Sequence, residues 1–104
     1  MKLIEKHREN KRNRMNERIV RELGKLGWER IGRSDLMEEY EKFEPHGKYV
    51  HCLDVCRKHD VDTKEEKPAE IYSYNHEGGG GVSLTAREAW LAVGIAVSRG
   101  WRVK

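Results

Sequence analysis

The sequence has few of the residues that define several large classes of protein. Of its 104 residues, only two are cysteine, two are proline and one is phenylalanine. Two cysteines are too few for a disulfide framework, so we expect a reducing, cytoplasmic setting. No apolar run approaches the ~20 residues that a membrane-spanning helix needs. The basic N-terminus also lacks the apolar segment of a signal peptide, so we expect no membrane partner.

Charge is abundant and unevenly distributed. Charged residues make up 38% of the chain and apolar residues 37%, and the net charge is +3. Residues 1–25 carry a net charge of +5, residues 26–72 carry −4 and residues 73–104 carry +2. The length predicts a single domain over residues 1–104, with a basic N-terminal segment that precedes an acidic middle.

The longest apolar segment lies near the C-terminus, within residues 83–100. Thr85 and Glu88 have the spacing of a capping box, which marks a helix start. Nine uncharged residues, AWLAVGIAV, follow, and Gly100 is a typical helix end. These features predict a buried helix of about four turns, which the rest of the chain must cover.

A second long helix is predicted over residues 2–26. Met15, Ile19, Leu23 and Leu26 recur at helical spacing, and Gly27 follows them. Residues 5–14 read EKHRENKRNR and contain no apolar position. We therefore expect residues 1–14 to form a projecting basic helical arm rather than to pack on a core.

The middle of the chain predicts short elements. Residues 28–32 suit a strand. Residues 35–44 place Leu36, Tyr40 and Phe43 at helical spacing before Pro45, which predicts a short amphipathic helix with an acidic outer face of Glu38, Glu39 and Glu41.

The next segments predict a hairpin. Residues 48–58 fit a strand or a helix, although their branched and aromatic residues favour a strand. Residues 69–76 alternate clearly, and the two segments should pair antiparallel across a long charged loop. Residues 101–104 add a last edge strand. The fold class is therefore α+β, with a small antiparallel sheet of three or four strands, two long helices and one short acidic helix.

The order of motifs resembles that of small phage α-β-α sandwich domains. The resemblance is carried by the helix end and strand LGKLGWERI, the hairpin, and the Ala-rich helix LTAREAWLAVGIA, over about residues 15–97. It implies a phage or prophage accessory protein and brings no catalytic residues. A double-stranded-RNA-binding domain has a similar order, but it has paired lysines where this chain has Leu84 and Thr85.

Thiol and imidazole groups gather in the middle of the chain. Cys52, Cys56 and His59 are ligand types that zinc accepts, with further histidines at positions 46, 51 and 76. A helix would bring Cys52 and Cys56 together, whereas a strand would place them about 13 Å apart. The alternatives are zinc, a cysteine nucleophile with a nearby histidine, or two small buried hydrophobes with surface histidines.

A run of four glycines precedes the C-terminal helix, at residues 78–81. Such a run can cradle a phosphate at a helix N-terminus. The Lys-Ser/Thr pair of a phosphate-binding loop is missing after it, so a flexible connector is the favoured interpretation.

The basic arm is the main candidate binding element. Its cations fall mostly on one side of the predicted helix, and the candidate contacts are Lys6, Arg8, Lys11, Arg12, Arg14 and Arg18. An acidic protein surface and a nucleic-acid backbone are both candidate partners, and a merely solvated helix face is the third interpretation. No aromatic residue interrupts the arm, so base stacking is not predicted.

The acidic middle of the chain is a candidate binding surface for the basic arm of a second copy, so a homodimer is a further candidate. We expect no catalytic residues. The sequence predicts a non-catalytic binding or inhibitor protein that docks on a macromolecular partner through its basic N-terminal helix and occludes it. Direct nucleic-acid binding by the same helix is the first alternative, and a zinc- or thiol-dependent site is the second.

Overall fold

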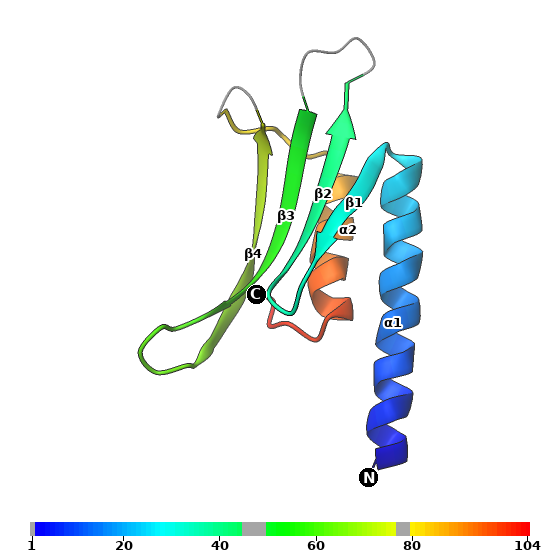
Figure 1. Ribbon diagram of the computed structural model, residues 1–104, viewed down its shortest axis with the longest axis vertical. Coiled ribbons are helices and arrows are strands. Elements are labelled where there is room, and N and C mark those ends of the chain that lie inside the picture. The colour runs from blue at the N-terminus through cyan, green and yellow to red at the C-terminus, as the bar shows by residue number, and fades with distance from the viewer. Residues whose placement is uncertain (1, 45–49, 77–79) are drawn as a thin grey trace.

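A computed structural model describes residues 2–44, 50–76 and 80–104. The chain forms α1 (Lys2–Lys25), β1 (Trp28–Arg33), β2 (Met37–Phe43), β3 (Val50–His59), β4 (Glu66–Asn75) and α2 (Ala86–Ser98). The strands make one antiparallel sheet in the order β1-β2-β3-β4. Both helices pack together on one side of this sheet, with α2 behind the strands and α1 along the β1 side (Figure 1). The α+β class and the four-stranded antiparallel sheet are confirmed.

The predicted short acidic helix over residues 35–44 is wrong. This segment forms β2, which pairs with β1 and β3 on its two sides. Alternation along the strand turns Glu38, Tyr40 and Lys42 toward the helices and turns Glu39 and Glu41 away from them. Within the described ranges, the fold therefore has two helices and not three.

The strand interpretation of residues 48–58 is confirmed over the described positions, since β3 runs from Val50 to His59. β3 and β4 form the expected antiparallel hairpin, with Cys52 opposite Tyr74 and Asp54 opposite Tyr72. The predicted edge strand at residues 101–104 is wrong. That segment lies beside β4, where the Ala69 amide donates to the Arg102 carbonyl at 2.7 Å, but it forms no strand.

The core lies between the sheet and the two helices. Its fully buried side chains come from every layer and include Leu23, Tyr40, Leu53, Val55 and Ile95. Among the described residues, neither helix is long and apolar enough to cross a bilayer.

Glycines end both helices as expected. Gly27 and Gly100 have φ values of +96° and +73°, which L side chains rarely adopt. The predicted capping box of α2 is also present, because the Glu88 amide donates to the Thr85 hydroxyl and the Thr85 amide donates to the Glu88 carboxylate. These signals lie within a few residues of the sequence, which is why the sequence reveals them.

The helix that the sequence predicts to be buried is covered on one side, and its other side is exposed. Leu91, Ala92, Ile95 and Ala96 are buried, but Trp90 is 71% exposed and Val97 is 41% exposed. The outward side of α2 is therefore apolar and open to solvent beside α1.

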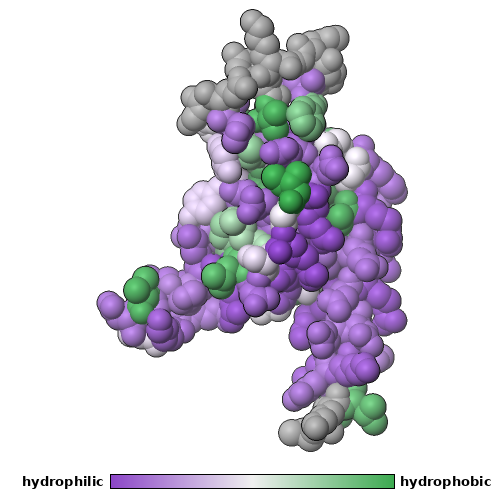
Figure 2. Space-filling model, in the orientation of Figure 1, coloured by the Kyte–Doolittle hydropathy of each residue, from purple (hydrophilic) through white to green (hydrophobic). Residues whose placement is uncertain are grey.

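The opposite face of the sheet carries no helix. Figure 2 shows this uncovered face, which is coloured mainly hydrophilic, with a few scattered hydrophobic residues. The molecule thus has one helical side and one open, polar sheet side.

Candidate functional site: a basic groove between the helices

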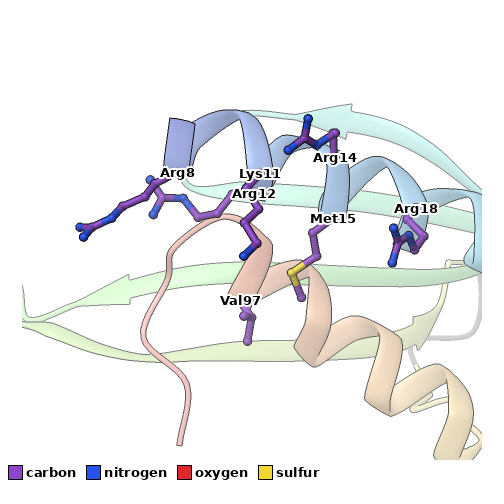
Figure 3. A pocket seen from close by; sticks show the side chains of 7 residues that line it. All are labelled: Arg8, Lys11, Arg12, Arg14, Met15, Arg18 and Val97. Carbon is purple, nitrogen blue, oxygen red and sulfur yellow. The ribbon is translucent and has the colours of Figure 1, made fainter. Parts of the chain in front are cut away.

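A broad concave surface lies where the N-terminal half of α1 passes the end of α2. This groove has a volume of about 730 Å³. Five cationic side chains line it together with two apolar ones, and all seven are drawn in Figure 3: Arg8, Lys11, Arg12, Arg14, Met15, Arg18 and Val97. We refer to this surface as the basic groove.

The sequence of α1 explains why its cations are available. Residues 3–15 are all exposed, and Asn16 is the first buried position after them. Residues 5–14 contain no apolar side chain, so this part of the helix has no face to bury and its long basic side chains remain in solvent. Five of the six predicted contact residues line the basic groove, and Lys6 does not.

The cations of the basic groove differ from other arginines of the chain. Arg30, Arg33, Arg57, Arg87 and Arg99 each lie within 4 Å of a carboxylate oxygen. Over the described ranges, no ion pair joins any of the five groove cations to a carboxylate. Without such an ion pair among the described residues, their charges add to a positive potential over one concave surface.

The basic groove continues into an apolar one. The adjoining groove, of about 380 Å³, shares Met15, Arg18 and Val97 with the basic groove and extends along α2 past Trp90 and Gly94. Trp90 and Val97 are site residues that the sequence alone does not predict. The only signal for them is their position on the outward side of α2, and that side cannot be identified before the helix pairing is known.

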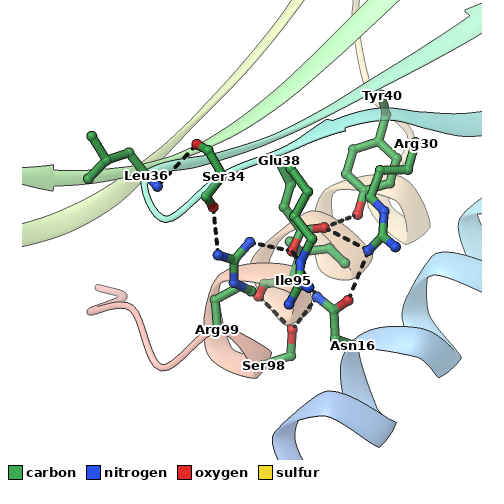
Figure 4. A network of polar contacts seen from close by, with 10 residues as sticks. Asn16, Arg30, Ser34, Leu36, Glu38, Tyr40, Ile95, Ser98 and Arg99 are labelled. Atoms are coloured by element: carbon green, nitrogen blue, oxygen red, sulfur yellow. Dashed lines mark hydrogen bonds and ion pairs between the residues drawn. The ribbon is translucent and has the colours of Figure 1, made fainter.

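A buried polar network fixes α1 against α2 below the basic groove. The Asn16 amide of α1 donates to the Glu38 carboxylate at 3.0 Å and to the Ser98 hydroxyl at 2.9 Å. Arg99, next to the end of α2, donates to Glu38 at 2.8 Å, and the Tyr40 hydroxyl donates to it at 2.6 Å (Figure 4). Glu38 itself is completely buried. One carboxylate thus connects both helices to β2.

The charge state of Glu38 follows from these contacts. Burial alone raises the pKa of the Glu38 carboxyl, because a charge is poorly solvated there. Hydrogen bonds from Tyr40, Arg99 and Asn16 outweigh burial and bring the pKa below its ordinary value. Glu38 is therefore an ionised group in the interior, with Arg30 and Arg99 as its counter-charges.

The thiol and imidazole groups do not gather around one point on β3. Cys52 and Cys56 lie four residues apart on the face away from the helices, and His51 lies on the opposite face, 2.6 Å from Glu44. Burial raises the pKa of both thiols, and the carboxylates near them raise it further. Within the part of the chain that the structure describes, no three His, Cys, Asp or Glu residues are arranged to hold a metal ion. The zinc site of Cys52, Cys56 and His59 stays a prediction.

The glycine run does not lead directly into a helix. Its first two residues lie outside the described ranges, and Val82, Ser83, Leu84 and Thr85 separate its end from Ala86, where α2 begins. Gly81 instead pairs with Tyr74 of β4.

No protein-family model, curated protein or solved structure matches this chain. The resemblance to phage sandwich domains therefore stays a prediction, and the basic groove is interpreted from its own chemistry.

Proposed function

We propose that this is a non-catalytic binding protein that docks on an acidic partner protein through the basic groove. One observation carries the proposal: five cations that form no ion pair with a carboxylate of the described residues surround apolar side chains contributed by two helices. A partner that presents carboxylates around an apolar contact satisfies both parts of this surface. By covering its partner's acidic surface, the protein would prevent other molecules from binding there.

The apolar part of the groove favours a protein partner over a nucleic-acid backbone. Met15, Val97 and Trp90 remain 37%, 41% and 71% exposed, and apolar contacts of this kind supply most of the affinity in protein interfaces. The arginines add specificity and a faster association rate, since they attract acidic surfaces over a distance set by the salt concentration.

Nucleic-acid binding is the second candidate function, and Trp90 is the observation that supports it. The arm itself contains no aromatic residue, but the fold places this exposed indole in the groove that continues from the basic one. A base could stack on Trp90 while the arginines contact phosphates, as in many single-strand binders.

Fluorescence anisotropy separates the two candidates. One probe is a labelled amphipathic peptide whose helical turns alternate between glutamate and leucine residues. The other is a labelled single-stranded oligonucleotide. We expect the peptide to bind more tightly, and its affinity to fall as salt rises. Tighter binding of the oligonucleotide, with a steep dependence on salt, would instead support the second candidate.

A matched pair of variants assigns the binding to the groove. Arg8→Glu with Lys11→Glu reverses two groove cations, and Lys64→Glu with Lys104→Glu makes the same change in charge at exposed positions outside it. We expect the first variant to lose at least about tenfold in affinity and the second to change much less. Equal losses in both variants would show that only net charge matters and would contradict a groove-specific site.

A further inference from the structure

The face of the sheet away from the helices is acidic, and it carries unfavourable pairs of like charge. Five carboxylates lie on it, from all four strands: Glu29, Glu39, Glu41, Asp54 and Glu70. Glu29 is directly opposite Glu41, and Glu39 is directly opposite Asp54. Like charges in directly opposed positions destabilise a sheet. We refer to this surface as the acidic face.

The described parts of the chain supply little positive charge to the acidic face. Lys58 lies 3.8 Å from Glu70 and 5.4 Å from the centre of the Tyr72 ring, at one end of the face. Asp54 accepts a hydrogen bond from Tyr74, whereas no ion pair with another described residue involves Glu29, Glu39 or Glu41. A cationic surface that covers the acidic face would relieve this repulsion.

The chain itself contains such a surface. The basic groove has five cations that form no ion pair within the part of the chain that the structure describes. It lies between the two helices, whereas the acidic face is on the side of the sheet that carries no helix. A single molecule therefore does not bring the two surfaces together, because its own sheet separates α2 from the acidic face. Two molecules can do so.

We propose that the acidic face binds the basic groove of a second copy of this chain, so that the protein self-associates head to tail. Because the two contacting surfaces are different, a dimer keeps one free basic groove and one free acidic face, and association continues beyond a dimer unless a ring closes. Self-association uses the same groove as the proposed function, and a bound partner would therefore compete with it.

Sedimentation velocity tests the proposal on the whole chain. We expect the weight-average mass to rise with protein concentration at about 10 mM NaCl and to return to that of a monomer at about 1 M, as the Debye length falls from about 30 Å to about 3 Å. A monomer at every concentration in low salt would overturn the proposal.

Charge variants identify the two surfaces. Glu39→Lys with Glu41→Lys removes two carboxylates from the acidic face, and Asp62→Lys with Glu65→Lys makes the same charge change in the loop between β3 and β4. We expect only the first variant to be monomeric. It should melt no lower than the natural chain, because each new lysine lies opposite a carboxylate. Persistent self-association of this variant contradicts the acidic face as the site.

Mixing two monomeric variants tests the head-to-tail geometry. Glu39→Lys with Glu41→Lys keeps the basic groove, and Arg8→Glu with Lys11→Glu keeps the acidic face. We expect a discrete one-to-one complex from the mixture, since one intact contact forms and neither free surface can continue the chain. Two components that stay monomeric when mixed would overturn this geometry.

The same variants separate this inference from the proposed function. The Glu39→Lys, Glu41→Lys variant should bind the acidic peptide at least as well as the natural chain, because its groove is unchanged and no longer occupied. If this variant lost peptide binding, the basic groove would not bind the peptide independently of the acidic face, which would count against the proposed function. Loss of self-association alone supports the inference.

Discussion

The guanidinium of Arg99 donates a hydrogen bond to the buried carboxylate of Glu38 at 2.8 Å, across 61 positions of sequence. A second nitrogen of the same guanidinium donates to the Ser34 carbonyl at 2.6 Å, and the guanidinium carbon lies 4.7 Å from the centre of the Trp101 ring. The end of α2 is thus held to the β1–β2 turn and to β2. Since Val97 is one of the walls of the basic groove, this contact also fixes the groove's shape.

Replacing Glu38 with glutamine should destabilise the fold by about 3–5 kcal/mol, the usual cost of removing one partner of a buried ion pair. The change leaves the guanidinium groups of Arg30 and Arg99 without their counter-charge. Urea denaturation at neutral pH measures the loss. Glu39→Gln is the matched control, because its side chain lies on the opposite face, and we expect a change within about 0.5 kcal/mol. Equal stability of Glu38→Gln and Glu39→Gln would contradict the network's role.

Stability should fall on acidification. Glu38 and Glu88 are both buried, and contacts in the fold bring both pKa values below the ordinary 4.5 despite the opposing effect of burial. A carboxyl with a lowered pKa stabilises the folded state above its unfolded pKa, and this contribution disappears as pH falls through the folded pKa. We expect a flat free energy of unfolding between about pH 6 and 7 and a steady decrease below about 4.5.

Denaturation series at several pH values check this decrease. In Glu38→Gln the dependence on pH should be weaker, because one of the two buried groups no longer titrates. A stability that rises as the pH drops from 5 to 3 would contradict the assigned direction.

Gly94 allows α1 and α2 to pack closely. A Cβ atom at this position would lie 2.8 Å from Cδ1 of Ile19. Gly94→Ala alone should destabilise the protein or leave it unchanged, because the overlap opposes a gain of up to about 1 kcal/mol in helix propensity. In an Ile19→Val background, which lacks Cδ1, the same substitution should stabilise the protein. Thermal melts of all four proteins give the coupling, and additive effects would contradict the contact.

The parts of the fold that the sequence predicted have local signals. Thr85 with Glu88 and the terminal glycines of both helices are recognised within a few residues. β2 was mistaken for a helix because Leu36, Tyr40 and Phe43 match a helical period, while the true alternation requires Glu38 to be buried. Burial of a glutamate is unfavourable unless partners such as Asn16 and Arg99 form hydrogen bonds with it. These two residues come from other elements, which reach Glu38 only when the chain has folded.

The candidate site was predictable to a similar extent. The cations of the arm follow from the composition of residues 5–14, because a helix without apolar positions stays exposed. Their concave arrangement around Val97, and the nearby indole of Trp90, depend on how α2 crosses α1. The acidic face likewise depends on strand register, which sets Glu39 opposite Asp54.

Trp90 should report directly on occupation of the groove. Trp28 and Trp101 are 4% and 6% exposed, whereas Trp90 is 71% exposed, so a neutral quencher such as acrylamide acts mainly on Trp90. Bound acidic peptide should cover this indole and reduce the quenching, and about 1 M NaCl should restore it because screening releases the peptide. Trp90→Phe, at an exposed position, should keep its melting temperature and lose most of the quenchable fluorescence. If the peptide bound while quenching of Trp90 stayed unchanged, the occupant would lie on the arm alone, and the apolar part of the groove would have no share in recognition.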